Sequence, residues 1–462
     1  MLTPLFEKKL LLAYSALLAI LLFYLMNIGY TTSDDVQIAT QSFSEAYTNA
    51  IRAGRLTWVT AMPVGLISQT IGSIWFTKIL RLIWAIAFFN AVFLVLRDRL
   101  SFATTVFVAL LPIIFYANDW DHHAFSSYPG LVIFGASCFF YSLYFLNRYL
   151  DTNRRLFQVI SSLFFINSFI TELFPTLIIF LIIYPHKSLF SRIKASFLHI
   201  TALLIFIFLY FVFKSDTSTY PLEFNGVAIK TWFIYSYSQI YSLHLVNFKS
   251  ILHINYFEIL IILIGVGLIA YITRAFTYCR SVVTYEGINL KLVAWWFLLS
   301  VWINVPVALT KNYQGWVVGG SKAYLYSALS NFIASICIGL VLVVILEKIK
   351  FKKIPVALLI VFLSCIYVAH SLQSYNVYLS QRYSYERWKF VDNLAVKSYF
   401  SPGKCYIAPW LFDLNGIVMI RTDDYWDVYL SKNWGIKAKI LKMENSDCFA
   451  SEFLDDPRRK PY

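Results

Sequence analysis

Long apolar segments recur along the whole chain, and they constrain the fold more than any other feature of the sequence. A helix needs about 20 mostly apolar residues to cross the hydrocarbon core of a bilayer. Only 14% of the 462 residues are charged and 59% are hydrophobic, far from the balance of a soluble domain. The sequence therefore predicts an all-α polytopic membrane protein in a lipid bilayer. Its runs of spanning length fall near residues 10–28, 76–96, 100–117, 129–146, 197–213, 257–273, 290–309, 325–346 and 354–372.

One further apolar run, residues 156–184, is interrupted at Glu172 and Pro175 and has basic residues at both ends. Lys and Arg concentrate in cytoplasmic loops, so both ends are expected on the cytoplasmic side. The run then forms a hairpin of two short helices. This brings the prediction to about eleven transmembrane helices, with the amino terminus cytoplasmic and the carboxyl terminus extracytoplasmic.

The first run follows Lys8 and Lys9, and this order of basic and apolar residues is typical of a signal peptide. Its end, residues 25–28, lacks the small residues of a cleavage site, and the run is long enough to span. An uncleaved first helix is therefore expected.

The net charge of +14 would suggest nucleic acid in a soluble protein. Here most basic residues lie in the predicted cytoplasmic loops, so no nucleic-acid partner is expected. Arg52, Arg55, Lys78 and Arg81 run against this trend, because they fall on the predicted outer side. Because of these four residues, we expect a function on the outer face.

From Gln373 the chain becomes polar, which divides it into a membrane domain, 1–372, and a small α/β extracytoplasmic domain, 373–462. Residues 373–398 have helical spacing, and strands are expected near 405–408 and 438–441 around a helix near 423–433. Cys405 and Cys448 form either a disulfide or two free thiols. The other cysteines are expected in apolar helices (Cys138, Cys337 and Cys365) or in an inner loop (Cys279).

Two carboxylates, Asp34 and Asp35, lie just beyond the first apolar run, and Arg52 and Arg55 follow in the same outer segment. A carboxylate in this position can act as general base toward a sugar hydroxyl. A forked guanidinium can hold a phosphate. The alternative is that Ser33 and Asp34 merely cap a helix.

A second polar group, at residues 118–123, is predicted on the same face. Its Asp and His side chains suit hydrogen bonds to an acceptor or to a phosphate, and a hydrogen-bonded helix end is the alternative. A metal site is a third reading, although adjacent residues rarely point to one ion. The residues concerned are Asp119, Asp121, His122 and His123.

Three more charged residues are candidates on this face. Glu172 either completes the site or caps the short helix before Pro175. Lys311 and Lys322 lie in an outer segment that three glycines are expected to keep as a loop. These two cations either clamp a lipid phosphate or extend from a helix end to the interface.

An acidic pair in the first outer loop, directly after an inside-to-outside helix, resembles the C-type (GT-C) superfamily of membrane glycosyltransferases. The layout of the whole chain supports the resemblance, including an interfacial helix expected near 66–75, but the motif is only Asp34-Asp35, with Gly54-Arg55. Within the superfamily the chain is similar to bacterial O-antigen glucosyltransferases, which modify lipopolysaccharide. The resemblance implies a polyprenyl-phosphate sugar donor, an acceptor on the outer leaflet, inversion at the anomeric carbon and an aspartate base.

We therefore expect a glycosyltransferase of the bacterial inner membrane that transfers a sugar such as glucose to an envelope glycan or lipid acceptor. Asp34 or Asp35 would be the base, and Arg52, Arg55, Lys311 and Lys322 would hold the donor phosphate. No cofactor is required, and a divalent metal, although compatible with these residues, has no specific support. No Walker loop, dinucleotide fingerprint or serine-hydrolase elbow occurs.

Three alternatives to this expectation remain. A lipid-linked saccharide transporter or flippase would carry charged or broken helices near the midplane of the membrane. An O-antigen polymerase or ligase would use a lipid diphosphate. A non-catalytic scaffold would leave the aspartate pair without a role.

Overall fold

The computed structural model describes residues 4–26, 42–52, 74–115, 125, 130–170, 173–213, 222–237, 254, 256–282, 288–320, 325–349, 353–412, 425–443 and 451–454. Within these ranges the chain is mostly helical. Its helices before the C-terminal region are α1 (Pro4–Met26), α3 (Phe43–Arg52), α5 (Ile74–Arg97), α6 (Phe102–Ile114), α7 (Leu131–Thr152), α8 (Arg155–Asn167), α9 (Leu173–Thr176), α10 (Ile178–Ile183), α11 (Leu189–Ala195), α12 (Phe197–Phe213), α13 (Gly226–Tyr237), α14 (Tyr256–Val282), α15 (Leu290–Trp302), α16 (Val305–Ala308), α17 (Lys311–Val318), α18 (Leu325–Lys348) and α19 (Lys353–Val396). The C-terminal region adds β1 (Cys405–Ile407), α20 (Pro409–Phe412), α21 (Tyr425–Trp434), β2 (Lys439–Leu441) and β3 (Ser451–Phe453).

Six described helical segments are long and apolar enough to cross a membrane, or seven if α11 and α12, which meet at 56°, count as one bent span. The predicted apolar runs all coincide with helices, but four of them do not belong to this set. They form α1 and the shorter apolar helices at residues 102–114, 155–167 and 173–183. Length and composition thus support a multi-pass membrane protein with six or seven such spans, fewer than the eleven predicted.

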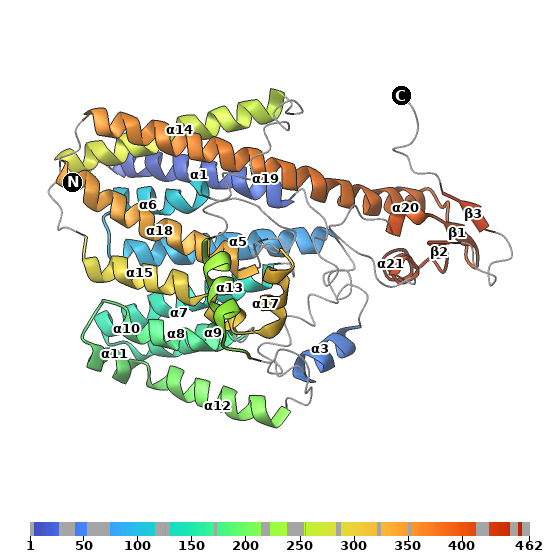
Figure 1. Cartoon of the computed structure of the whole chain (residues 1–462), viewed down its shortest axis with the longest axis horizontal. Coiled ribbons are helices and arrows are strands. Elements are labelled where there is room, and N and C mark those ends of the chain that lie inside the picture. Colours follow the sequence, from blue (N-terminus) through green and yellow to red (C-terminus); the bar gives the residue numbers. More distant parts are fainter. Residues whose placement is uncertain are drawn as a thin grey trace.

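The amino terminus and the C-terminal region lie at opposite ends of the helical body (Figure 1). The connections after α5, α7 and α10 meet at the end where the amino terminus lies. Asp151, at the end of α7, contacts His186, just after α10, with 2.8 Å between carboxylate oxygen and ring nitrogen. The run at 156–184 therefore returns to the end where it begins, as the predicted hairpin requires. The turn was predicted near residues 172–175: Glu172 lies outside the described residues, and Leu173, Phe174 and Pro175 are buried residues of the short helix α9.

Close helix contacts occur where glycine removes a side chain from the interface. A Cβ atom at Gly135 of α7 would lie 2.6 Å from the ring of Phe174 in α9. In α14, a Cβ atom at Gly265 would lie 2.5 Å from ring atoms of Tyr367 in α19. Interiors this tightly packed resist any added volume. These two positions therefore set how closely α7 approaches α9 and α14 approaches α19.

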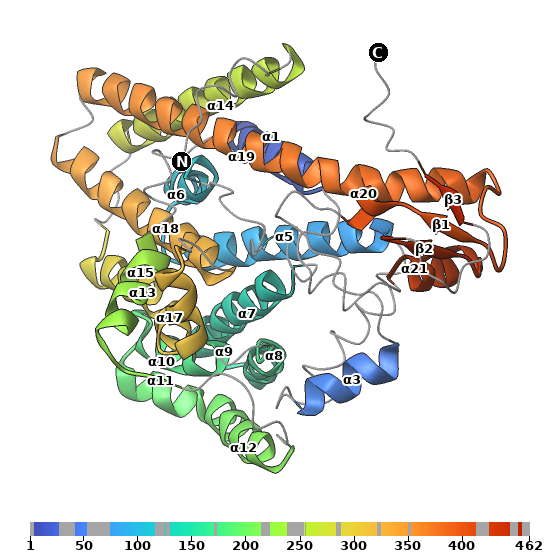
Figure 2. The ribbon, with the colours of Figure 1, turned by 45° about the vertical axis from the view of Figure 1, so that its right-hand side comes forward.

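The long helix α19 joins the membrane part to the C-terminal region without interruption, as Figure 2 shows. The domain boundary predicted at residue 373 thus falls inside one helix. Three parallel strands in the order β2-β1-β3 form a sheet between the end of α19 and α21. Trp388 of α19 and Trp426 of α21 are completely buried in the core beside the sheet. This agrees with the predicted α/β character of the region.

The described cysteines divide as follows. Cys138 and Cys337 are buried in helices, and Cys365 is an exposed residue of α19. Cys279 is buried in α14, which continues nine residues past the predicted apolar run at 257–273, so the predicted loop position was wrong. Cys405 is disulfide-bonded. Cys448, the partner predicted from the sequence, lies outside the described residues.

Candidate functional site

The structure describes three of the residues predicted as functional: Arg52, Lys311 and Cys405. Arg52 is exposed in the last turn of α3, a cation position that the helix dipole favours. Ser42 and Glu45 form a capping box at the other end of α3, where the Ser42 amide donates to Glu45 Oε2 at 2.7 Å. The remaining predicted residues lie outside the described ranges: Asp34, Asp35, Arg55, Asp119, Asp121, His122, His123, Glu172, Lys322 and Cys448.

Two cations on α5 are buried at the end of the helix that faces the C-terminal region. The side chains of Lys78 and Arg81 have exposed fractions of 7% and 1%. Lys389 of α19 and Arg81 both lie near enough to Lys78 to repel its charge. Arg387, two residues before Lys389, is also buried. Lys389 thereby brings a positive charge from a distant part of the sequence close to Lys78.

The C-terminal core holds these two helices together. Leu80 of α5 packs against the cluster that contains Trp388, and the first residue of α7, Leu131, belongs to the same cluster. The cations beside Leu80 and Trp388 therefore lie where the membrane part meets the C-terminal region. Lys78 and Arg81 could be identified from the sequence by their departure from the charge rule. Arg387 and Lys389 gave no comparable signal, because their helix was read as part of an ordinary polar domain.

Phe125, from the predicted outer loop at 118–128, packs against the middle of α5. The ring of Phe125 lies 5.7 Å from that of Phe88 and 5.9 Å from that of Phe89, measured between centroids. Gly130 precedes α7 with a φ of 78°, and a Cβ atom there would lie 3.8 Å from the Cα of Arg81. The start of α7 therefore lies beside Arg81, whereas Asp119, Asp121, His122 and His123 lie outside the described residues.

Lys311 lines a separate cavity of about 460 Å³ between the start of α13 and α17. The cavity wall also includes Glu223, Asn225, Asn312 and Trp316. Residues 311–318 form the helix α17, so the loop predicted for this segment was wrong. The side chains of Gln314 and Val317, both in α17, are buried. This packing outweighs the low helix propensity of Gly315. Gly320, with a φ of 97°, does need glycine's freedom.

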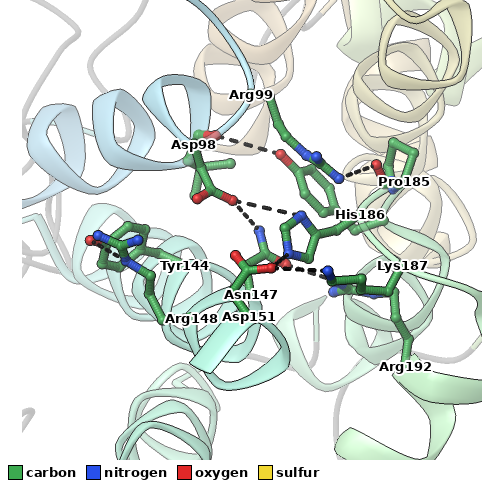
Figure 3. Close-up of polar contacts among 12 residues, drawn as sticks. Asp98, Arg99, Tyr144, Asn147, Arg148, Asp151, Pro185, His186, Lys187 and Arg192 are labelled. Carbon is green, nitrogen blue, oxygen red and sulfur yellow. Dashed lines mark hydrogen bonds and ion pairs between the residues drawn. The ribbon is translucent and has the colours of Figure 1, made fainter. Parts of the chain in front are cut away.

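A polar network lies at the opposite end of the molecule, where α5, α7, α10 and α11 meet (Figure 3). Oδ1 of Asp151 accepts from His186 at 2.8 Å and lies 3.3 Å from Nζ of Lys187. Asn147 donates to Asp98 at 3.2 Å, and Arg99 donates to the Pro185 carbonyl. These contacts tie together the connections that follow α5, α7 and α10.

The network also includes a group that could hold a metal ion. Ligand atoms of Asp98, Asp151 and His186 lie within 4.8 Å of one another. However, Lys187 already pairs with Asp151, and Arg99 lies close enough to His186 to repel a positive charge on its ring. A further cation would meet this repulsion in a partly desolvated place. The arrangement is therefore better explained as a structural network. Its basic residues follow the charge pattern of the sequence, whereas no pattern along the chain indicates that Asp98, Asp151 and Asn147 are their partners.

No protein-family model matches this sequence, and a search of curated proteins finds no significant match. The geometry of the described residues and the sequence pattern are therefore the basis for the functional argument.

Proposed function

We propose that the protein is an inverting membrane glycosyltransferase that moves a sugar from a polyprenyl-phosphate donor to an envelope glycan or lipid acceptor. The observation that carries the proposal is the burial of Lys78 and Arg81 beside Lys389, at the end of the apolar helix α5. Ionisable side chains in apolar membrane helices are rare and usually serve a function. A phosphate on a membrane lipid is an anion, and a guanidinium binds it in forked geometry.

In the proposed reaction the acceptor hydroxyl oxygen attacks the anomeric carbon of the donor sugar. Asp34 or Asp35 takes the hydroxyl proton, and the bond from the anomeric carbon to the phosphate oxygen breaks. Polyprenyl phosphate leaves with the electron pair of that bond. Arg52, Arg55 and the buried cations on α5 stabilise its charge as it develops. Because the donor already carries a phosphate leaving group, positioning and one base suffice, and no nucleotide or cofactor is required.

The proposed architecture is a GT-C-like membrane domain, residues 1–372, with an extracytoplasmic domain, 373–462. All eleven predicted apolar segments coincide with helices, and the start of α1 and the C-terminal sheet lie at opposite ends of the helical body, which supports an odd number of crossings. The basic residues Arg99, Arg148 and Lys187 gather at the end where the amino terminus lies, which favours a cytoplasmic location for that end. In this proposal the membrane is the bacterial inner membrane, and the substrates reach the protein from its periplasmic side.

Transfer by the full-length protein in lipid nanodiscs tests the proposal. The donors are radiolabelled polyprenyl-phosphate sugars and, separately, the corresponding nucleotide sugars, each with outer-membrane glycolipid as acceptor. We expect labelled glycolipid and free polyprenyl phosphate from a lipid-phosphate donor and no product from a nucleotide donor. If the lipid-linked sugar crosses the bilayer of sealed vesicles with its phosphate bond intact, the protein is a flippase. Transfer only from a lipid diphosphate would identify a polymerase or ligase.

A further inference from the structure

The cavity between α13 and α17 has walls that hydrogen bonds hold in place before any ligand arrives. The buried side chain of Gln314 donates to the carbonyl oxygens of Glu223, at 2.7 Å, and Ala308, at 3.0 Å. The backbone amide of Glu223 donates to the Leu309 carbonyl at 2.8 Å. Residues 222–225 are thereby fixed against the start of α17. The cavity is a widely open groove, and its volume of about 460 Å³ lies within the usual range of small-molecule sites, about 300–1,000 Å³.

One carboxylate in this wall is oriented by its neighbour. Asn225 donates from Nδ2 to Oε1 of Glu223 at 3.0 Å, while its own Oδ1 accepts from the Ala228 amide at 2.9 Å. Both groups of the Asn225 side chain are thus used to fix the start of α13 and the direction of Glu223. A carboxylate held in this way can accept hydrogen bonds from neighbouring hydroxyls of one ligand.

The opposite wall provides an aromatic surface. Trp316 lines the cavity with 46% of its surface exposed, and its ring contacts Tyr313 edge to face, with centroids 4.9 Å apart. An indole face attracts the weakly positive hydrogens of an apolar ligand face through its quadrupole. The charges of Lys311 and Glu223 balance, so the cavity as a whole suits a neutral ligand better than a phosphate.

From these observations we infer that the cavity between α13 and α17 is a subsite for the pyranose ring of a saccharide. One face of the ring stacks on Trp316, and its hydroxyls bond to Glu223 and the neighbouring amides. The inference rests on the proposed function and names a recognition element for its substrates. It also changes the expected role of Lys311 from a phosphate clamp to a hydroxyl ligand. The ring belongs either to the glycan acceptor or to the donor sugar.

Direct binding of free sugars to the full-length protein in nanodiscs tests this inference. The probes are glucose, galactose, mannose, rhamnose and N-acetylglucosamine, each followed by saturation-transfer NMR. We expect at least one sugar to bind to the wild type and to bind at least tenfold more weakly to Trp316→Ala and Glu223→Gln. Trp434→Phe, a partly exposed tryptophan of the C-terminal region, is the matched control and keeps wild-type affinity. Trp316 and Glu223 are both exposed, and a thermal melt of each variant verifies folding.

The two sources of the sugar ring are separated by adding unlabelled polyprenyl-phosphate sugar. Displacement of the bound free sugar identifies the donor subsite, and an unchanged signal identifies the acceptor subsite. The inference is overturned if no sugar binds to the wild type, or if binding is unaffected by both variants. Because this measurement needs no transfer, its failure is distinguishable from failure of the glycosyltransferase assay.

Discussion

The guanidinium of Arg192 donates from Nε to the Leu181 carbonyl oxygen and from Nη1 to Oδ1 of Asn147, both at 2.8 Å. A second guanidinium nitrogen, Nη2, also donates to Leu181. Arg192 is fully buried, so one side chain of α11 fixes the end of α10 against α7. This relationship, rather than apolar packing alone, determines how the predicted hairpin closes onto its neighbours.

Replacing Arg192 with Leu is expected to destabilise the protein, because a buried carbonyl and a buried amide oxygen lose their donor. Each unsatisfied group costs about 1–3 kcal/mol. Arg192→Lys should recover only part of this loss, since an ammonium cannot reproduce the fork. Thermal unfolding in detergent, followed by near-UV circular dichroism, measures the effect. Lys194→Gln, an exposed residue of the same helix, is the control, and an equal loss there would contradict the assignment.

His186 predicts a pH dependence of stability. Burial, followed by the positive charge of Arg99, lowers the pKa of His186 below its usual value, while Asp151 and Asp98 oppose this shift. The folded protein then binds fewer protons than the unfolded chain just below about pH 6.5. The contribution of His186 to the free energy of unfolding is therefore fully present above that pH and is lost as the pH falls through the folded pKa.

The measurement is the unfolding temperature of wild type, His186→Gln and, as a control, the exposed-residue variant Lys194→Gln between pH 5 and 7.5. One proton contributes at most about 1.4 kcal/mol per pH unit. We expect the slope below about pH 6.5 to decrease in His186→Gln only. Identical profiles for all three proteins would show that the ring does not titrate in this range.

The contact between α14 and α19 can be tested with two glycines of the same helix. A Cβ atom at Gly265 would meet the ring of Tyr367, whereas one at Gly267 would meet nothing within 4 Å. Gly265→Ala is therefore expected to lower the free energy of unfolding by about 1–3 kcal/mol, as overpacked interiors do. Gly267→Ala should be neutral or slightly stabilising, because alanine favours a helix. Equal thermal stability of the two variants would mean that α14 and α19 do not pack as described.

Arg81 gives a prediction about activity. Arg81→Gln should lower transfer from a polyprenyl-phosphate donor by about 10–100-fold, mainly through a higher KM for the donor, if one charged hydrogen bond of about 1.5–3 kcal/mol is lost. Arg81→Lys should restore part of the activity. The matched control, Arg155→Gln, removes an exposed arginine at the opposite end of the molecule. An unchanged KM for the donor in Arg81→Gln would show that the buried cations do not bind the donor phosphate.

The apolar segments were readily predicted from the sequence, because spanning a membrane requires mainly length and hydrophobicity. Their classification as spans was less certain: α6, α8 and α9–α10 are apolar but short, and the side chains of α6 are buried among other helices. The segment at 311–318 was taken for a loop because its glycines are visible in the sequence, whereas the burial of Gln314 and Val317 is not.

The polar contacts could be predicted from the sequence to a smaller extent than the helices. Lys78 and Arg81 could be noticed because they break a charge pattern along the chain. Their proximity to Lys389 depends on two helices about 300 residues apart in sequence being brought together by the C-terminal core. The contact of Asp151 with His186 likewise depends on the hairpin closing. Pairings of this kind are properties of the packed helices, and no local pattern encodes them.

The most direct test of the glycosyltransferase account is transfer by Asp34→Asn and Asp35→Asn, compared with wild type and with Asp455→Asn as control. Each protein is reconstituted in nanodiscs at equal, verified folding, and release of polyprenyl phosphate is measured with a saturating lipid-linked donor. Loss of the general base is expected to lower the rate of transfer by about 10²–10⁴-fold. The account predicts that at least one of the two variants loses activity by this factor while Asp455→Asn retains it. Equal transfer by all four proteins would contradict the assignment of the base and, with it, the proposed mechanism.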